Sequence, residues 1–169
     1  LDIAQMLYQV RMLSDWYKST ENEETSIGYL FVSLAPNKYL EDKIKNAVVS
    51  EDEISDMASH ELANIRRKIA QAGVRIRESL DKLIRSSEVQ KSLRENIVTM
   101  RDGRYVLPVK ADFKGNVPGL VHATSATGST YFIEPISVVE ANNDIKVLQG
   151  EEQDEIDRII AELSADCAA

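Results

Sequence analysis

The chain has 169 residues, 43% hydrophobic and 28% charged, which is typical of a globular protein, and its net charge of −8 argues at first against nucleic acid as a partner. No apolar run approaches the roughly 20 residues that a membrane-spanning helix needs, and the sequence does not start with the basic-then-apolar pattern of a signal peptide. The single cysteine, Cys167, excludes an internal disulfide, so we expect a cytoplasmic protein.

The first third of the sequence predicts short amphipathic helices. Apolar residues recur at spacings of three and four from Ile3 to Tyr17, which is the repeat of one helix face. A second apolar patch, 27–34, stops before Pro36, and a third helix is expected over 39–49. We therefore predict a domain of core helices over 1–58.

A long helix is expected after Ser59, whose hydroxyl suits the N-cap position. The apolar residues that follow repeat every seven positions, with a second set between them, as in a coiled coil. The members of this stripe are Leu62, Ile69, Ile76 and Leu83, together with Ile65, Ala72 and Leu80.

The pattern then changes to the period of two that is typical of strands. Residues 97–100 and 104–111 flank Asp102-Gly103, a strong hairpin signal. Residues 118–123 and 130–133 flank a turn rich in Ser, Thr and Gly, so four short antiparallel strands are predicted at about 96–134. Pro108 suggests an edge strand or a bulge, because proline has no N–H to donate to a neighbouring strand.

A last long helix is expected from Pro135, with an apolar seam that Asn142 and Glu152 interrupt. The two long helices enclose the strands in sequence. The predicted fold is therefore mainly α with a small antiparallel β-sheet (α+β): core helices at 1–58, and a long antiparallel helical hairpin at 59–169 that carries the sheet at its tip.

The charges are distributed unevenly, which matters more for binding than their sum. Residues 63–114 hold 13 Lys/Arg and 6 Asp/Glu, whereas the first 61 residues hold 5 and 12, and residues 134–169 hold 2 and 10. Basic side chains and loop hydroxyls near the strands could hold a phosphate backbone, although an ordinary solvated sheet face is an equally good explanation of the spacing. The candidates are Arg101, Arg104, Lys110, Lys114, Ser125, Thr127 and Ser129.

Four aromatic residues of the strands could stack on bases, but such residues more often fill a core. They are Tyr105, Phe113, Tyr131 and Phe132. The basic stretch 66–77 of the long helix has a structural alternative too, since it could pair with the acidic run 151–157 across the hairpin.

Residues suited to catalysis are few. His60 and His122 are far apart in sequence, no group has the spacing of metal ligands, and there is no GxxxxGK[ST] phosphate loop. The adjacent carboxylates of 151–155 are typical of a solvated helix face. We therefore expect no catalytic, cofactor or metal site within these residues.

Two segments resemble the bacterial MutS-two family, the second MutS paralogue: RDGRYVLPVKA at 101–111 and VPGLVHATSATGSTYFIEP at 117–135. VEANN at 139–143 continues the resemblance, which covers essentially the whole chain. The family usually has proline where this chain has His60.

The resemblance implies that this chain is the core, lever and clamp part of a longer protein. Full-length members carry an ATPase domain, which binds ATP and Mg, and many end in a Smr endonuclease domain. They form homodimers, suppress homologous recombination by binding branched DNA, and split collided ribosomes. The expected role of this part is a lever without a catalytic site that contacts DNA or the ribosome; the alternative is a purely structural coiled-coil spacer or dimerisation arm.

Overall fold

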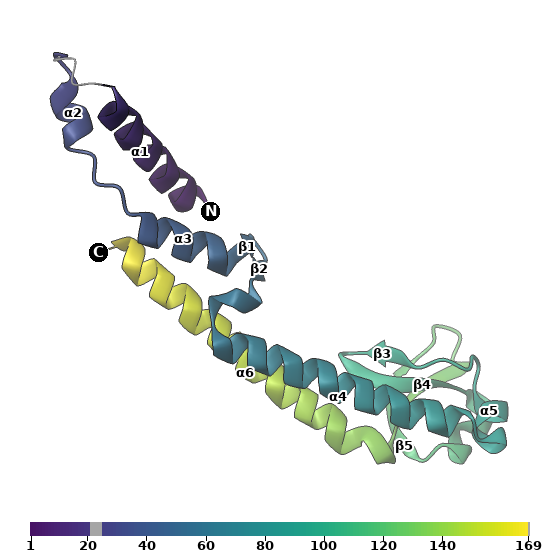
Figure 1. The fold of residues 1–169 in the computed structure, drawn as a ribbon. Helices are drawn as coiled ribbons and strands as arrows, with labels where there is room; N and C mark the ends of the chain where they lie inside the picture. The colour runs from purple at the N-terminus through teal and green to yellow at the C-terminus, as the bar shows by residue number, and fades with distance from the viewer. Residues whose placement is uncertain (21–24, 169) are drawn as a thin grey trace. The chain divides into compact units, whose positions relative to one another are not determined.

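The computed structural model describes residues 1–20 and 25–168, which form helices and two small antiparallel sheets (Figure 1). This confirms the predicted fold class, mainly α with a small antiparallel sheet. The chain divides into two compact units: Leu1–Asn64 with Gln153–Ala169, called the terminal unit below, and Ile65–Glu152, called the sheet unit. These units divide the chain within its two long helices, whereas the domains expected at 1–58 and 59–169 stay a prediction.

The terminal unit consists mainly of helices. Its elements are α1 (Asp2–Ser19), α2 (Gly28–Val32), α3 (Lys38–Ala47), β1 (Val48–Ser50), β2 (Glu53–Ile54), the 3-10 turn η1 (Asp56–Ala58), the start of α4 (His60–Ile84) and the end of α6 (Ile136–Ala168). The helix predicted over 3–17 is confirmed as α1. The helix predicted over 39–49 is confirmed as α3, but it ends at Ala47, where strand β1 begins. Leu40 and Ile44 of α3 share a buried cluster with Leu62, Ile159 and Leu163, so α3 is packed against the two long helices.

A buried carboxylate joins α1 to α3. Glu41 is 1% exposed and accepts hydrogen bonds from Arg11 Nε at 2.8 Å and from Lys45 Nζ at 2.7 Å. Hydrogen bonds first from Arg11 and then from Lys45 hold the pKa of Glu41 at about 2, well below its usual 4.5. The charge is therefore compensated although the side chain is removed from water.

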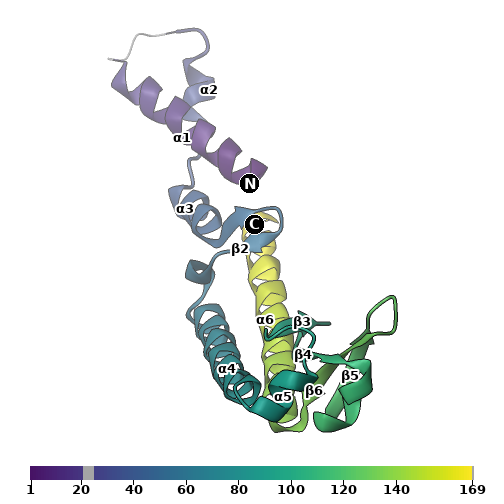
Figure 2. The same cartoon turned by 90° about the vertical axis from the view of Figure 1, so that its right-hand side faces the viewer.

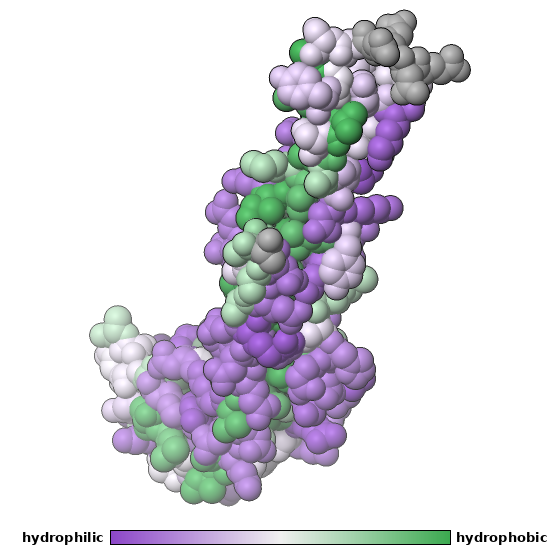
Figure 3. All heavy atoms as spheres, turned by 90° about the vertical axis from the view of Figure 1, so that its left-hand side faces the viewer, coloured by the Kyte–Doolittle hydropathy of each residue, from purple (hydrophilic) through white to green (hydrophobic). Residues whose placement is uncertain are grey.

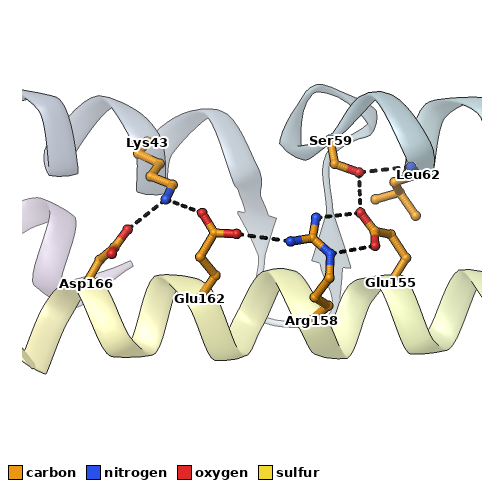
Figure 4. A network of polar contacts seen from close by, with 7 residues as sticks. All are labelled: Lys43, Ser59, Leu62, Glu155, Arg158, Glu162 and Asp166. Carbon is orange, nitrogen blue, oxygen red and sulfur yellow. Dashed lines mark hydrogen bonds and ion pairs between the residues drawn. The ribbon is translucent and has the colours of Figure 1, made fainter.

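A row of ion pairs lies along α6 in the terminal unit (Figure 4). Lys43 Nζ of α3 contacts Glu162 at 2.6 Å and Asp166 at 2.7 Å, and Arg158 contacts Glu162 at 3.1 Å. Arg158 also donates to Glu155, at 2.7 and 2.8 Å. All three carboxylates of this row thus have a basic partner, which agrees with a structural role for the acidic part of α6.

Ser59 confirms the predicted N-cap of the long helix α4. Its Oγ accepts from the Leu62 N–H at 2.9 Å and donates to Glu155 at 2.6 Å (Figure 4). Hydrogen bonds from Arg158 and then Ser59 lower the pKa of Glu155 to about 2. One hydroxyl therefore both caps α4 and joins it to α6.

Apolar side chains also reach the surface of the terminal unit (Figure 3). Among the described residues, 14 of the 22 large hydrophobic side chains that are exposed belong to this unit. Met6, Trp16, Tyr29 and Val32 are between 57% and 74% exposed. An apolar surface of this extent is typical of a face that another segment or subunit covers.

The sheet unit places four strands beside α4 and α6 (Figure 2). Its other elements are α5 (Ser87–Ser92), β3 (Thr99–Arg101), β4 (Arg104–Lys110), the 3-10 turn η2 (Ala111–Asn116), β5 (Gly119–Thr124) and β6 (Thr130–Pro135). The strand order is β3-β4-β6-β5 and every pair is antiparallel, so the four predicted strands are confirmed. Asp102 (φ 51°) and Gly103 (φ 71°) form the predicted turn between β3 and β4.

The predicted apolar stripe of α4 faces the core. Ile76 and Leu80 are at most 1% exposed and share a cluster with Leu107, Ile133 and Val138 of the sheet and α6. The expected pairing of the basic part of α4 with the acidic run is confirmed at one point, where Arg66 Nε contacts Glu152 at 2.7 Å.

The edge position inferred for Pro108 is wrong, because β4 lies between β3 and β6. The proline is tolerated since β3 pairs only with residues 104–106 and ends before reaching it. The carbonyl of Pro108 accepts instead from the Arg94 N–H at 2.8 Å. The register between β4 and β6 is continuous through Pro108, and the irregularity of this sheet lies in β5, between Val121 and Ala123.

Candidate nucleic-acid interface

The two units differ in charge. The sheet unit contains 14 Lys/Arg and 11 Asp/Glu, a net charge of +3, whereas the terminal unit contains 6 and 17, a net charge of −11. A polyanion is therefore attracted to the sheet unit and repelled by the terminal unit.

The predicted contact residues form two groups at opposite ends of β4. Arg101 and Arg104 lie at the β3–β4 turn and are called the turn group below. The far group consists of Lys110, Lys114, Ser125, Thr127 and Ser129. Over the seven residues of β4, at about 3.3 Å each, the two ends are about 20 Å apart. This distance is between backbone positions, and the guanidinium of Arg101 lies over Phe132, which is the register partner of Pro108.

Arg101 is exposed, and its guanidinium lies over the Phe132 ring, 3.9 Å from the centroid. It also donates to the Met100 carbonyl at 2.7 Å and to Thr99 Oγ1 at 3.3 Å. Among residues 1–20 and 25–168 it forms no ion pair with a carboxylate. Its charge is held at the surface and remains available to an anion.

Arg104 has a structural partner. It donates to the buried Glu134 at 2.7 Å and to Asn143 Oδ1 at 2.6 Å. Glu134 is 0% exposed and also contacts Nε2 of His122. Because Arg104 neutralises this buried carboxylate, its part in nucleic-acid binding stays a prediction with less support than that of Arg101.

Asn142 completes this network and was not among the predicted site residues. Its Nδ2 donates to Glu134 at 2.7 Å and to the Tyr105 carbonyl at 3.1 Å, while its Oδ1 accepts from the Tyr105 N–H at 3.1 Å. Asn142 is 0% exposed, so α6 is joined to β4 by a buried amide. The only feature of the sequence that pointed to a structural role for Asn142 was its position within the apolar seam of the last helix.

The far group combines two lysines with a turn of hydroxyls. Lys110 Nζ donates to the Lys91 carbonyl at 3.1 Å and Lys114 Nζ lies 4.9 Å from the centroid of the Tyr131 ring. In the described part of the chain neither lysine forms an ion pair. Thr127 Oγ1 and Ser129 Oγ are 2.8 Å apart, so these hydroxyls share a hydrogen bond.

All four aromatic rings of the sheet unit have a cation over them, although base stacking was one of their predicted roles. The other two pairs are Arg77 over Tyr105 at 5.5 Å and Lys110 over Phe113 at 5.8 Å. All four distances are within the roughly 6 Å over which a cation and a ring attract each other, and Arg101 over Phe132 is the shortest of them. Tyr105 and Tyr131 also pack against the core, which supports the structural alternative for these two. Stacking on bases stays a prediction.

No group of three or more His, Cys, Asp or Glu that could hold a metal ion is present in the described residues. Within the same residues no helix is long and apolar enough to cross a membrane. The arrangement offers cations, hydroxyls and one fixed buried carboxylate.

Known proteins match this chain over nearly its whole length. Proteins named endonuclease MutS2 are 49% identical in Ruminiclostridium cellulolyticum, 46% in Clostridium beijerinckii and 45% in Acetivibrio thermocellus. These matches cover 97–99% of this chain but only 21–22% of each relative, so the chain spans about a fifth of their length. No protein-family model matches. The resemblance to the MutS-two family is confirmed.

Proposed function

The chain belongs to the MutS-two family as one segment of its longer proteins, and we propose that its sheet unit binds nucleic acid through the phosphate backbone. The observation that carries the proposal is the set of cations fixed over aromatic rings without a carboxylate partner: Arg101, Lys110 and Lys114.

Fixed cations suit this task for two reasons. Contacts to phosphate need positive charge but no base-specific geometry, so they position a nucleic acid without reading its sequence. A side chain that already rests on a ring loses less conformational entropy when it binds. The net charge of the sheet unit is +3 and that of the terminal unit is −11, which supports binding of a polyanion by the sheet unit.

For the whole protein we propose the activities that the family resemblance implies. The relatives are named endonucleases, and nuclease and ATPase activity, with ATP and Mg, would belong to parts outside this segment. Branched DNA and the ribosome are the expected partners, in a homodimer and in the cytoplasm. The long helices would transmit nucleotide-driven movement to the sheet unit.

The test is charge reversal in the full-length protein. We expect R101E/K110E/K114E to lose affinity for ribosomes or for branched DNA, with a fall of about 0.9 in the slope of log K against log salt for each lost phosphate contact. Arg104 is left intact because reversing it would leave Glu134 buried and unpaired. Co-sedimentation and gel-shift assays at two salt concentrations measure both ligands.

The matched control reverses three exposed cations on α4 that have no ion pair in the described residues: K68E/R75E/K82E. This control variant has the same net charge as R101E/K110E/K114E. Equal losses in the two triple variants would show that only total charge matters, and unchanged binding in both would refute the proposal.

A second candidate, a structural spacer or dimerisation arm, is favoured by the exposed apolar side chains of the terminal unit. Under that function, R101E/K110E/K114E binds both ligands normally. M6S and W16S would then change the oligomeric state of the full-length protein in sedimentation velocity, because they remove apolar surface that a partner would cover.

A further inference from the structure

The pair of Arg101 and Phe132 differs in kind from the other cations that lie over rings in the sheet unit. Its distance of 3.9 Å, from Cζ of the guanidinium to the ring centroid, is close to the roughly 3.5–4.0 Å at which carbon atoms are in contact. The other three pairs of the described residues lie between 4.9 and 5.8 Å. A guanidinium is also planar, unlike the ammonium group of a lysine. One flat group therefore rests in contact on another.

Phe132 lies on the face of the sheet that is turned away from the core. Its neighbours along β6, Tyr131 and Ile133, pack in the cluster that α4 and α6 share with the sheet. Side chains alternate between the two faces of a strand, so the Phe132 ring belongs to the opposite face. Its register partners are Pro108 and Ala123, whose short side chains leave room for a flat group over the ring.

The guanidinium of Arg101 is held from two sides. Its Nη1 donates to the Met100 carbonyl at 2.7 Å and to Thr99 Oγ1 at 3.3 Å, both in β3, whereas the ring beneath it belongs to β6. Arg101 is nevertheless exposed, so the ring covers one face of the guanidinium and the other face is turned to solvent. Among residues 1–20 and 25–168, the N–H groups on Nε and Nη2 make no hydrogen bond. A flat, charged and positioned surface is thus open to a ligand.

We propose that the outer face of the Arg101 guanidinium is a platform on which one unpaired base stacks. Unpaired bases stack on arginine planes as they do on aromatic rings. The N–H groups at the edge of the guanidinium donate to the phosphate beside that base. A paired base does not use the platform, because its neighbours in the duplex already cover both of its faces. Phe132, for which base stacking was predicted, carries the guanidinium instead of the base.

This inference rests on the proposed function and names the class of ligand, a nucleic acid with single-stranded nucleotides. The probe is a DNA fork with a single-stranded arm of thymidines, compared with the same fork whose arm is abasic. The two forks have the same phosphates, so the ratio of their affinities measures the bases alone. The full-length protein should bind the thymidine fork at least about 5-fold more tightly, since stacking of one base contributes at least about 1 kcal/mol.

R101K keeps the charge and removes the plane. It should reduce the preference for thymidines by about 5-fold and leave the slope of log K against log salt as in wild type. F132L removes the ring under the guanidinium and should reduce the preference in the same direction. The matched control R75K makes the same change at an exposed arginine of α4, which has no ion pair or ring contact within the described residues, and should keep the wild-type preference.

The same two arms made of ribonucleotides, uridines or abasic, distinguish RNA bases from DNA bases as the occupant. A preference that R101K loses in either series supports the platform. If the wild-type protein shows no preference in either series, or R101K retains it, the platform is refuted. The proposed function then still stands, provided that R101E/K110E/K114E lowers the salt slope.

If the triple variant also binds every fork as wild type does, both proposals fail. Melting temperatures establish that each variant is folded. Should F132L unfold, the preference of R101K alone decides.

Discussion

Replacing Asn142 by alanine should separate α6 from the sheet. The amide of Asn142 makes three hydrogen bonds, to the Tyr105 N–H, the Tyr105 carbonyl and Glu134, at 3.1, 3.1 and 2.7 Å. β6 pairs with β4 only from Leu107 onward, so this side chain takes the place of a strand partner at Tyr105. Asn142→Ala removes the side-chain partner of the Tyr105 N–H and of the Tyr105 carbonyl, whereas Glu134 Oε1 keeps its hydrogen bond from Arg104.

The expected loss of stability is about 3 to 5 kcal/mol. Each hydrogen bond contributes about 1 kcal/mol net, and a buried polar group left unsatisfied costs about 1–3 kcal/mol. The larger end of this range applies because Asn142 and Glu134 are both 0% exposed. Water entering the space of the lost amide would move the result toward the smaller end.

Urea unfolding followed by circular dichroism measures the loss, and hydrogen exchange locates it. A loss of 3 kcal/mol that is local to the sheet unit speeds exchange of the Tyr105 amide by roughly 150-fold. Asn143→Ala is the matched control, since Asn143 is exposed and makes a single bond, to Arg104. A loss under about 1 kcal/mol, or one no larger than that of Asn143→Ala, would refute this account of the network.

Two further predictions concern glycines and acid stability. Gly119→Ala should destabilise the protein by about 3 kcal/mol, because the new Cβ would lie 2.1 Å from the Glu134 carbonyl oxygen and force β5 from β6. The same change at Gly150 of α6, where nothing lies within 4 Å, should stabilise it by about 1 kcal/mol, and equal urea midpoints for the two variants would contradict both expectations. Glu41→Gln should be less stable than wild type at neutral pH. Because the pKa of Glu41 is lowered from 4.5 to about 2 by folding, the difference should persist above pH 4.5 and shrink as the pH falls from 4.5 to about 2, and a difference independent of pH across that window would contradict it.

Local patterns were sufficient for the elements of this fold. Asp102-Gly103 predicted the hairpin because few other residue pairs adopt positive φ at both turn positions. Ser59 predicted the start of α4 because its hydroxyl satisfies a backbone N–H three residues away. The apolar stripe predicted which side of α4 is buried. Each of these depends on residues close in sequence.

The roles of the candidate residues were decided only by the tertiary structure. Arg104 is a structural partner rather than a free cation because Glu134, 30 residues away, is buried beside it. In the sequence Asn142 only interrupts the apolar face of the last helix, but in the structure it hydrogen-bonds the backbone of Tyr105, 37 residues away. Lys146 lies beside Gly103 of the β3–β4 turn, 43 residues away in sequence, only because α6 passes there. A sequence specifies local backbone conformation through neighbouring residues, but which charge is compensated depends on segments that folding alone brings together.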